Sequence, residues 1–172
     1  MKKLFILLIT MIYSFGIDIS TLKSYQADFL QTIVNPQGKS LEYKGKIYIL
    51  YPNLVLWNYK SPIEKDIYIK WDRVTIIEPE LEQAIITTMQ KQINMIDLFK
   101  NAKKVSQNHY ETIFQNKLYR LDLDNNIVKS ISYDDDLDNK VLIKFTNIKQ
   151  NQKIKESTFD YIIPFEYDII RK

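Results

Sequence analysis

The chain of 172 residues has no cysteine, only three glycines and a single histidine. Without cysteine it forms no disulfide, and it cannot be a lipoprotein that is anchored by acylation of a cysteine. Ser, Asp and Glu occur in no spacing typical of a catalytic triad, a paired acid or a metal site, and we expect His109 to be a solvated loop residue. The sequence therefore indicates a protein that is not an enzyme and needs no metal or cofactor.

A strong excess of charge is also missing. The 24 basic and 21 acidic side chains give a formal net charge of +3, and two of the basic residues, Lys2 and Lys3, lie at the very start of the chain. Without these two lysines the net charge is 3 − 2 = +1. Such a small charge does not drive binding to nucleic acid or to an anionic membrane surface, so we expect no nucleic-acid partner.

No apolar run is long enough for a membrane-spanning helix, which needs roughly 20 residues. The longest run, residues 4–15, follows Lys2 and Lys3 and is followed by Gly16. Ser14 and Gly16 are small residues placed as positions −3 and −1 of a cleavage site, which predicts a signal peptide over residues 1–16. A retained anchor is the alternative. We expect residues 17–172 to form the mature chain as a single exported domain.

Aromatic and β-branched residues are abundant, with twelve Tyr and eight Phe. This composition favours sheet over helix, and the length and apolar fraction fit one globular domain. Apolar runs with Asp and Asn between them recur every eight to twelve residues, which predicts a meandering antiparallel sheet. Besides the strands on either side of Pro52, the expected strands are residues 66–71, 73–77, 83–88, 109–114, 117–122, 127–133, 141–148 and 157–162.

The central stretch, residues 45–83, carries the strongest strand pattern. Its first strand alternates between two faces and ends at Pro52, which cannot donate a hydrogen bond to a neighbouring strand. The next strand presents alternate residues to the same side. We interpret this shared face as the apolar wall of a binding cavity, although such a face is more often plain core. The predicted wall residues are Ile47, Ile49, Tyr51, Val55, Trp57 and Tyr59.

Two segments have helical spacing instead. Residues 20–31 begin with a potential N-cap at Ser20 or Thr21, and residues 94–105 have Asn94 at the N-cap position. A turn is expected at residues 35–38, between two strands. Each helix has one apolar stripe, so both are expected to cover the concave face of the sheet as a lid. The predicted lid residues are Ile19, Leu22, Met95, Leu98 and Phe99.

Several of these segments resemble a known family, the LolA periplasmic carriers of outer-membrane lipoproteins. The strongest pieces are Ser-Tyr-Gln-Ala-Asp-Phe-Leu-Gln at 24–31, Gly-Lys-Ile-Tyr-Ile-Leu-Tyr-Pro-Asn-Leu-Val-Leu-Trp at 45–57, Ser-Pro at 61–62 and Glu-Leu-Glu-Gln at 80–83. Weaker pieces lie at 131–134, 145–147, 151, 159–161, 164 and 168–170. The similarity spans nearly the whole mature chain in the right order, which is more specific than any single piece.

The resemblance implies a mainly β fold, namely an unclosed and strongly curved antiparallel half-barrel of about eleven strands with short α-helices over an apolar cavity. It also implies a monomeric periplasmic chaperone that binds the acyl chains of lipid-modified proteins. Such a carrier receives its cargo from an inner-membrane ABC transporter of the LolCDE type and passes it to an outer-membrane acceptor, which in the family is LolB-like. A periplasmic lipid- or lipoprotein-binding sensor on the same scaffold is the alternative, and an esterase is a distant third.

One position departs from the family pattern. In the family an Arg precedes the Pro-Asn pair and hydrogen-bonds the lid, and here that position is Tyr51. A tyrosine offers one neutral donor where arginine offers five in a charged fork, so a Tyr51 latch is expected to be weaker by about 1 kcal/mol. An ordinary strand-end aromatic is the other interpretation. The acidic run from Asp134 to Asp138 is expected to be a solvated turn, because it lacks the Gly and Glu of a calcium loop.

Overall fold

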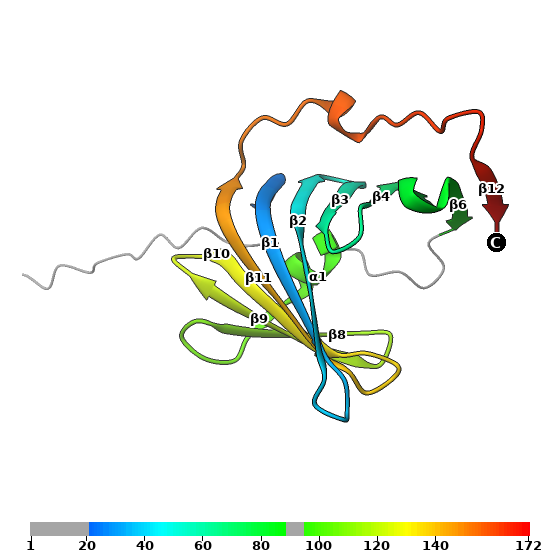
Figure 1. Cartoon of the computed structure of the whole chain (residues 1–172). Coiled ribbons are helices and arrows are strands. Elements are labelled where there is room, and N and C mark those ends of the chain that lie inside the picture. The colour runs from blue at the N-terminus through cyan, green and yellow to red at the C-terminus, as the bar shows by residue number, and fades with distance from the viewer. Residues whose placement is uncertain (1–20, 89–94) are drawn as a thin grey trace, which may run out of the picture.

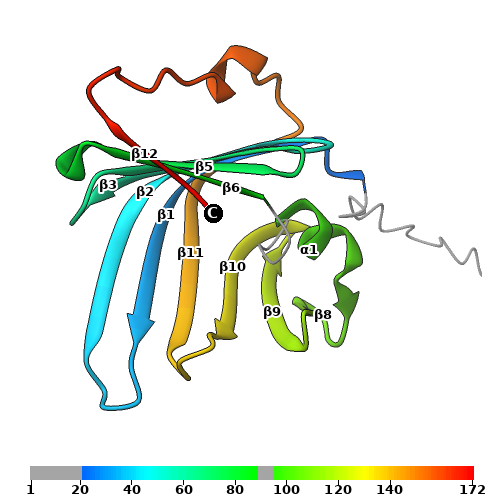
Figure 2. The ribbon, with the colours of Figure 1, turned by 90° about the vertical axis from the view of Figure 1, so that its right-hand side faces the viewer.

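The computed structural model describes residues 21–88 and 95–172. These residues form one twelve-stranded sheet in the order β12-β6-β5-β4-β3-β2-β1-β11-β10-β9-β8-β7. Figures 1 and 2 show that the sheet curves strongly and that its two ends do not meet. The expected mainly β half-barrel is therefore confirmed, with one strand more than the resemblance implied.

The strands are β1 (Ser24–Val34), β2 (Ser40–Leu50), β3 (Leu54–Ser61), β4 (Lys65–Lys70), β5 (Arg73–Glu78), β6 (Gln83–Thr88), β7 (Lys103–Lys104), β8 (His109–Phe114), β9 (Lys117–Asp124), β10 (Ile127–Asp134), β11 (Lys140–Gln150) and β12 (Asp168–Arg171). The described helical segments are α1 (Met95–Asn101) and the two 3-10 turns η2 (Pro79–Leu81) and η3 (Glu156–Phe159). No helix among the described residues has the length and apolar character that crossing a membrane requires.

Strand β1 lies at the centre of the sheet and pairs with β2 on one side and β11 on the other. The β1–β2 connection is the turn expected at residues 35–38. The Asn35 side chain accepts hydrogen bonds from the backbone N–H groups of Gln37 and Lys39 at 3.1 and 2.8 Å. Gly38 adopts φ = 80°, a conformation that glycine reaches without steric cost. The turn prediction is confirmed.

The helix expected over residues 20–31 is wrong for its described part. Residues 24–31 belong to β1, and Ser20 lies outside the described residues. Tyr25 and Phe29 are four residues apart, which suits a helix, but Ala27 between them is also buried, so the inward face has the period of a strand. Strand β2 pairs with β1 along its whole length and β11 pairs with it on the other side, with one register shift between Gln26 and Asp28, and this pairing overrides the local helical spacing.

Strands β2 and β3 approach each other closely at Gly45. Their pairing shifts by one residue between Lys44 and Gly45. A Cβ atom at Gly45 would collide with the backbone oxygen of Asn58 and with the ring of Phe29. Glycine is required here because only a residue without a side chain allows this close approach.

The sheet is covered by apolar residues on both faces. The main cluster lies on the concave face, where α1 is packed, and a second cluster of Leu56, Tyr68, Ile77 and Phe159 lies on the opposite face. The chain after β11 crosses this outer face before it reaches β12, as Figures 1 and 2 show in orange and red. The long apolar runs in the central stretch therefore reflect burial on both sides.

The strand expected at residues 157–162 is wrong. Residues 156–159 form η3, and the following residues form no sheet pairs. Phe159, Tyr161 and Ile163 alternate because an extended segment lays them against the outer face of the sheet, without joining its ladder. Apolar residues at every second position indicate an extended chain with one buried face, but they do not by themselves indicate pairing with another strand.

The other expected strands are present, with ends within two residues of the prediction. The sequence pattern missed β7, which has only two residues, and β12, which pairs with β6 in parallel. The helix expected over residues 94–105 is confirmed as α1 but ends at Asn101, because Lys103 and Lys104 pair with β8. Asn94, the expected N-cap, lies outside the described residues.

Candidate functional site: a cavity between the curved sheet and helix α1

A cavity of about 390 Å³ lies between α1 and the concave face of the sheet. Strands β1, β3, β4, β9, β10 and β11 supply one wall, and α1 supplies the other. The lining residues of the β8–β9 and β10–β11 turns are polar, and this side is the polar end of the cavity. The apolar lining residues are Trp57, Ile67, Ile69, Met95, Leu98, Ile131 and Ile143. The polar and tyrosine lining residues are Gln31, Tyr59, Gln115, Lys117, Tyr119, Tyr133, Asp135 and Asp136.

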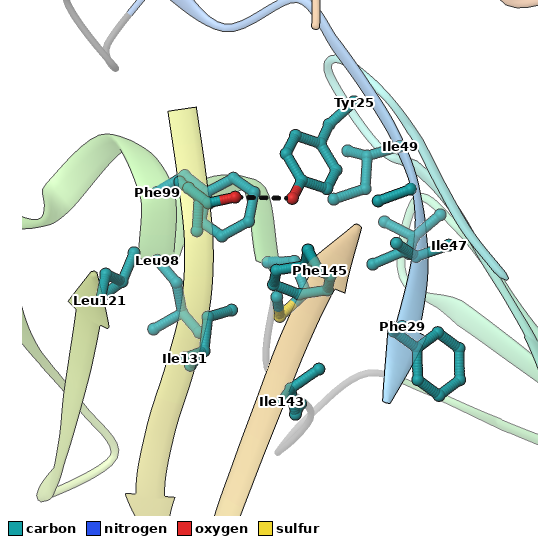
Figure 3. Packing of buried hydrophobic residues seen from close by; sticks show 14 of the residues in the cluster. Tyr25, Phe29, Ile47, Ile49, Leu98, Phe99, Leu121, Ile131, Ile143 and Phe145 are labelled. Carbon is teal, nitrogen blue, oxygen red and sulfur yellow. Dashed lines mark hydrogen bonds between the residues drawn. The ribbon is translucent and has the colours of Figure 1, made fainter. Parts of the chain in front are cut away.

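Helix α1 is held in place by three side chains on one face. Met95, Leu98 and Phe99 are spaced as one helical stripe and are all buried. The Phe99 ring meets the Tyr25 ring edge-on, with centroids 5.5 Å apart. Figure 3 shows Leu98 and Phe99 pointing from the helix towards the side chains of the sheet. Met95 and Leu98 also line the cavity, so the same face anchors the helix and forms part of the site.

Tyr25 places a hydroxyl group deep in this apolar region. Its hydroxyl donates a hydrogen bond to the backbone oxygen of Val128 at 2.9 Å, which is the dashed line in Figure 3. Burial raises the pKa of Tyr25, so the side chain stays neutral. A buried hydroxyl with a partner costs little, and the bond links β1 directly to β10 across the concave face.

The polar end of the cavity is built mainly from tyrosines. The Tyr59 hydroxyl donates to Gln31 Oε1 at 3.0 Å, and the rings of Tyr119 and Tyr133 lie 4.9 Å apart. Burial raises the pKa of Tyr59, and it raises the pKa of Tyr133 to about 12. These tyrosines are therefore neutral at physiological pH and offer hydrogen bonds without charge.

The carboxylates near this end hold the β10–β11 turn. Burial works against the charged form of Asp135, but hydrogen bonds from Asn139 and from the backbone N–H of Leu137 outweigh it and lower the pKa. Asp136 forms an ion pair with Lys117 at 2.7 Å. Within residues 21–88 and 95–172, no group of three or more acidic, histidine or cysteine side chains is placed to hold a metal. The expected solvated turn is confirmed.

His109 is exposed, as expected, but it lies in β8 and not in a loop. Its Nδ1 atom is 2.6 Å from Asp122 Oδ1 on the neighbouring strand, and Ser130 donates to the other oxygen of the same carboxylate. The histidine therefore belongs to a cross-strand polar contact outside the cavity.

The predicted wall residues separate into three groups. Trp57 and Tyr59 line the cavity. Ile47, Ile49 and Val55 are buried in the concave cluster and are absent from the cavity lining. Tyr51 is half-exposed beyond the end of β2 and lies outside the cavity.

Of the predicted lid residues, Met95 and Leu98 line the cavity, and Phe99 anchors the helix through its contact with Tyr25. Leu22 is buried in the concave cluster but precedes β1 and belongs to no described helix. Ile19 lies outside the described residues.

Tyr51 contacts α1 through its ring face. The Lys100 ammonium lies 3.4 Å from the centroid of the Tyr51 ring, a cation–π contact between the end of β2 and the last turn of α1. The Tyr51 backbone N–H also donates to the oxygen of Lys23 at 2.8 Å. The contact expected from the sequence used the hydroxyl as a donor, whereas the contact in the structure uses the aromatic face.

Several lining residues were not singled out from the sequence. Ile67 and Ile69 belong to the expected strand at 66–71, and Ile131 and Ile143 belong to strands later in the chain. Alternation within each strand identifies their inward face, but it does not say which strands face α1. Gln31 was missed because a helix was expected over residues 20–31, and the inward face of a strand was therefore not considered there.

Residues 20–118 match the family described as outer membrane lipoprotein carrier protein LolA. The chain is 35% identical to the outer-membrane lipoprotein carrier protein of Wolinella succinogenes, over 87% of each chain. It is 33% identical to that of Campylobacter jejuni, over 99% of this chain and 100% of the other.

Two solved structures share the fold at low sequence identity. An uncharacterized conserved protein from Thermus thermophilus has a TM-score of 0.56 at 11% identity, over 91% of this chain and 95% of the other. A LolA superfamily protein from Nitrosomonas europaea has a TM-score of 0.52 at 8% identity, over 82% and 91%. By the extent of its sequence matches, the chain belongs to the LolA family of outer membrane lipoprotein carrier proteins.

Proposed function

We propose that this protein is a periplasmic carrier that binds the acyl chains of lipoproteins released from the inner membrane and delivers them to the outer membrane. The observation that carries this proposal is the apolar cavity between the curved sheet and α1. The names of the related proteins support the same role. The protein acts by binding and release, without chemistry on its cargo.

The energetics of the task require such a cavity. Burying a methylene group is worth about 0.8 kcal/mol, so an acyl chain of roughly fifteen methylenes costs on the order of 12 kcal/mol to keep in water. A cavity of about 150 Å³ takes one benzene molecule, and by that measure the volume of about 390 Å³ holds about fifteen carbon atoms, close to one acyl chain. A second chain requires α1 to move away from the sheet.

Delivery adds a second requirement, because transfer runs only down a free-energy difference. The carrier must bind its cargo tightly enough to take it from the donor, and its affinity must be lower than that of the acceptor. The proposed donor is an inner-membrane ABC transporter of the LolCDE type, and the proposed acceptor is a LolB-like protein at the outer membrane. Helix α1 is short, and the burial of Met95, Leu98 and Phe99 together with the Lys100–Tyr51 contact sets the free energy that is needed to move it as a lid.

Lipoprotein release from inner-membrane vesicles tests the proposal. Vesicles that contain the matching transporter and a labelled lipoprotein are incubated with ATP and the purified protein, and soluble lipoprotein is measured after the vesicles are removed. We expect release as a soluble one-to-one complex that gives up its cargo to outer-membrane vesicles. A complex that forms but never hands over its cargo would favour the sensor alternative.

Two matched variants tie the release to the cavity. Met95→Glu places a charge on the cavity wall in the first turn of α1, where a negative charge suits the helix dipole. Ile113→Glu places the same charge at a site that is 73% exposed. Release is expected to fall at least tenfold with Met95→Glu and to stay unchanged with Ile113→Glu. Equal release by both variants would contradict the proposal.

A further inference from the structure

Gln31 is a buried polar side chain on the concave face, where it bonds Tyr59 at the polar end of the cavity. It lies on β1 with Tyr25, Ala27 and Phe29 on the same inward side, and it is only 8% exposed. It also lines the cavity beside apolar residues such as Trp57 and Ile143. Burying an amide is unfavourable unless its two N–H donors and its oxygen acceptor find hydrogen-bond partners.

The oxygen of the Gln31 amide has a partner, because the Tyr59 hydroxyl donates to Oε1 at 3.0 Å. No hydrogen bond joins Nε2 to any of the described residues, and no side-chain polar atom in this part of the chain is fully enclosed without a partner. The amide nitrogen is therefore left open on the cavity side, where the residue forms part of the lining. The Tyr59 bond holds the oxygen end of the amide and leaves the donors of Nε2 without a partner among the described residues.

A donor with this position selects an acceptor on the ligand. The neighbouring tyrosines are neutral, and Lys117 is paired with Asp136, so this end of the cavity suits an uncharged acceptor. An acyl chain ends in such a group, because its carbonyl belongs to the ester or amide that attaches the chain covalently to the rest of the lipoprotein. We propose that Gln31 is a polar subsite whose Nε2 donates a hydrogen bond to the acyl carbonyl of the cargo and thereby sets how deeply the chain enters.

This inference rests on the proposed function, because it needs an acyl chain in the cavity. It goes further by assigning a recognition role to a residue outside the apolar wall. An aliphatic chain slides freely along an apolar surface, whereas one hydrogen bond at a fixed depth gives it a register. The cavity then distinguishes an acylated ligand from one that carries a plain alkyl chain of the same length.

Three soluble peptides of identical sequence test the subsite. Each carries a long chain on one side chain, attached as a palmitoyl amide, a palmitoyl ester or a hexadecyl ether, and the ether has no carbonyl. Binding is followed by the fluorescence of Trp57, which lines the cavity, in a Trp71→Phe background that removes the other tryptophan. Trp71 is exposed and outside the cavity, so this background leaves the site intact.

The test variant is Gln31→Leu, and Gln31→Met serves if the branched side chain impairs folding. Gln26→Leu is the matched control, because Gln26 lies on the same strand and points to the opposite face. Loss of one hydrogen bond is expected to weaken the amide and ester peptides about tenfold and to leave the ether peptide unchanged. A loss confined to one carbonyl peptide also supports the subsite and identifies the linkage that it recognises.

The outcomes separate this inference from the proposed function. Equal weakening of all three peptides, or no weakening of any, overturns the subsite while the cavity remains an acyl-chain site. Failure of the wild-type protein to bind all three peptides overturns the proposed function together with the subsite. An equal effect of Gln26→Leu on the carbonyl peptides also overturns the role of Gln31.

Discussion

Tyr51 and Lys100 form the contact that joins the end of β2 to the end of α1. Because the ammonium lies over the ring face, the contact depends on the aromatic ring and not on the hydroxyl. We expect Tyr51→Leu to speed hydrogen exchange of the α1 amides about two- to fivefold, as expected for the loss of about 0.5–1 kcal/mol at an exposed site. Tyr51→Phe is expected to change the exchange little.

A double-mutant cycle checks that the two side chains act together. Lys100→Gln alone is expected to match the effect of Tyr51→Leu, and the double variant is expected to add little to either. Full additivity, or an effect of Tyr51→Phe as large as that of Tyr51→Leu, would show that the ring face does not hold the helix.

The residues of the site could be predicted from the sequence only in part. The alternation around Trp57 and Tyr59 placed both on an inward face, and the helical spacing of Met95 and Leu98 placed both on α1. The same alternation holds for Ile47, which lies in the core and not in the cavity lining. Whether an inward residue meets a neighbour or empty space depends on the curvature of the sheet, which no local pattern encodes.

Among the elements, the segment between β11 and β12 is attached to the outer face of the sheet by Phe159 and, beside it, by Tyr161, whose hydroxyl lies 2.8 Å from Thr75 Oγ1. Phe159 is fully buried among Leu56, Tyr68 and Ile77, while Phe165 in the same segment is fully exposed. Removal of a buried phenylalanine ring costs about 3–5 kcal/mol. Phe159→Ala is therefore expected to release the segment and to speed its limited proteolysis at least a hundredfold, with the sheet left intact.

Phe165→Ala is the control for this prediction, because it removes the same ring from the same segment without loss of a buried contact. Mass spectrometry of the fragments locates the cleavage. Equal cleavage rates in the two variants would contradict the attachment through Phe159.

Two segments show where the secondary-structure predictions failed. Residues 24–31 have a spacing that fits both a helix and a strand, and pairing with β2 and β11 decides between them. Residues 157–162 have the period of a strand but pair with nothing, because their side chains lie on the sheet and their backbone does not join it. Both errors arise because long-range pairing is invisible in a local pattern.

At the scale of the whole molecule, the open half-barrel presents two kinds of apolar surface. The cavity lies on the concave side beneath α1, and the segment outside the sheet exposes Ile162 and Phe165 almost completely. An acyl chain has affinity for either surface, since the hydrophobic effect is not directional. Carriage of an acyl chain through water requires the chain to enter the cavity, where it is shielded from water on several sides.

Photo-crosslinking with a lipopeptide that carries a photoreactive group midway along its acyl chain tests this requirement most directly. After irradiation of the complex, mass spectrometry identifies the modified residues. The account predicts crosslinks to cavity residues, chiefly Trp57, Leu98 and Ile143. Crosslinks that fall instead on Ile162 and Phe165 would contradict it, because the chain would then bind the outer surface and the cavity would not be the carrier site.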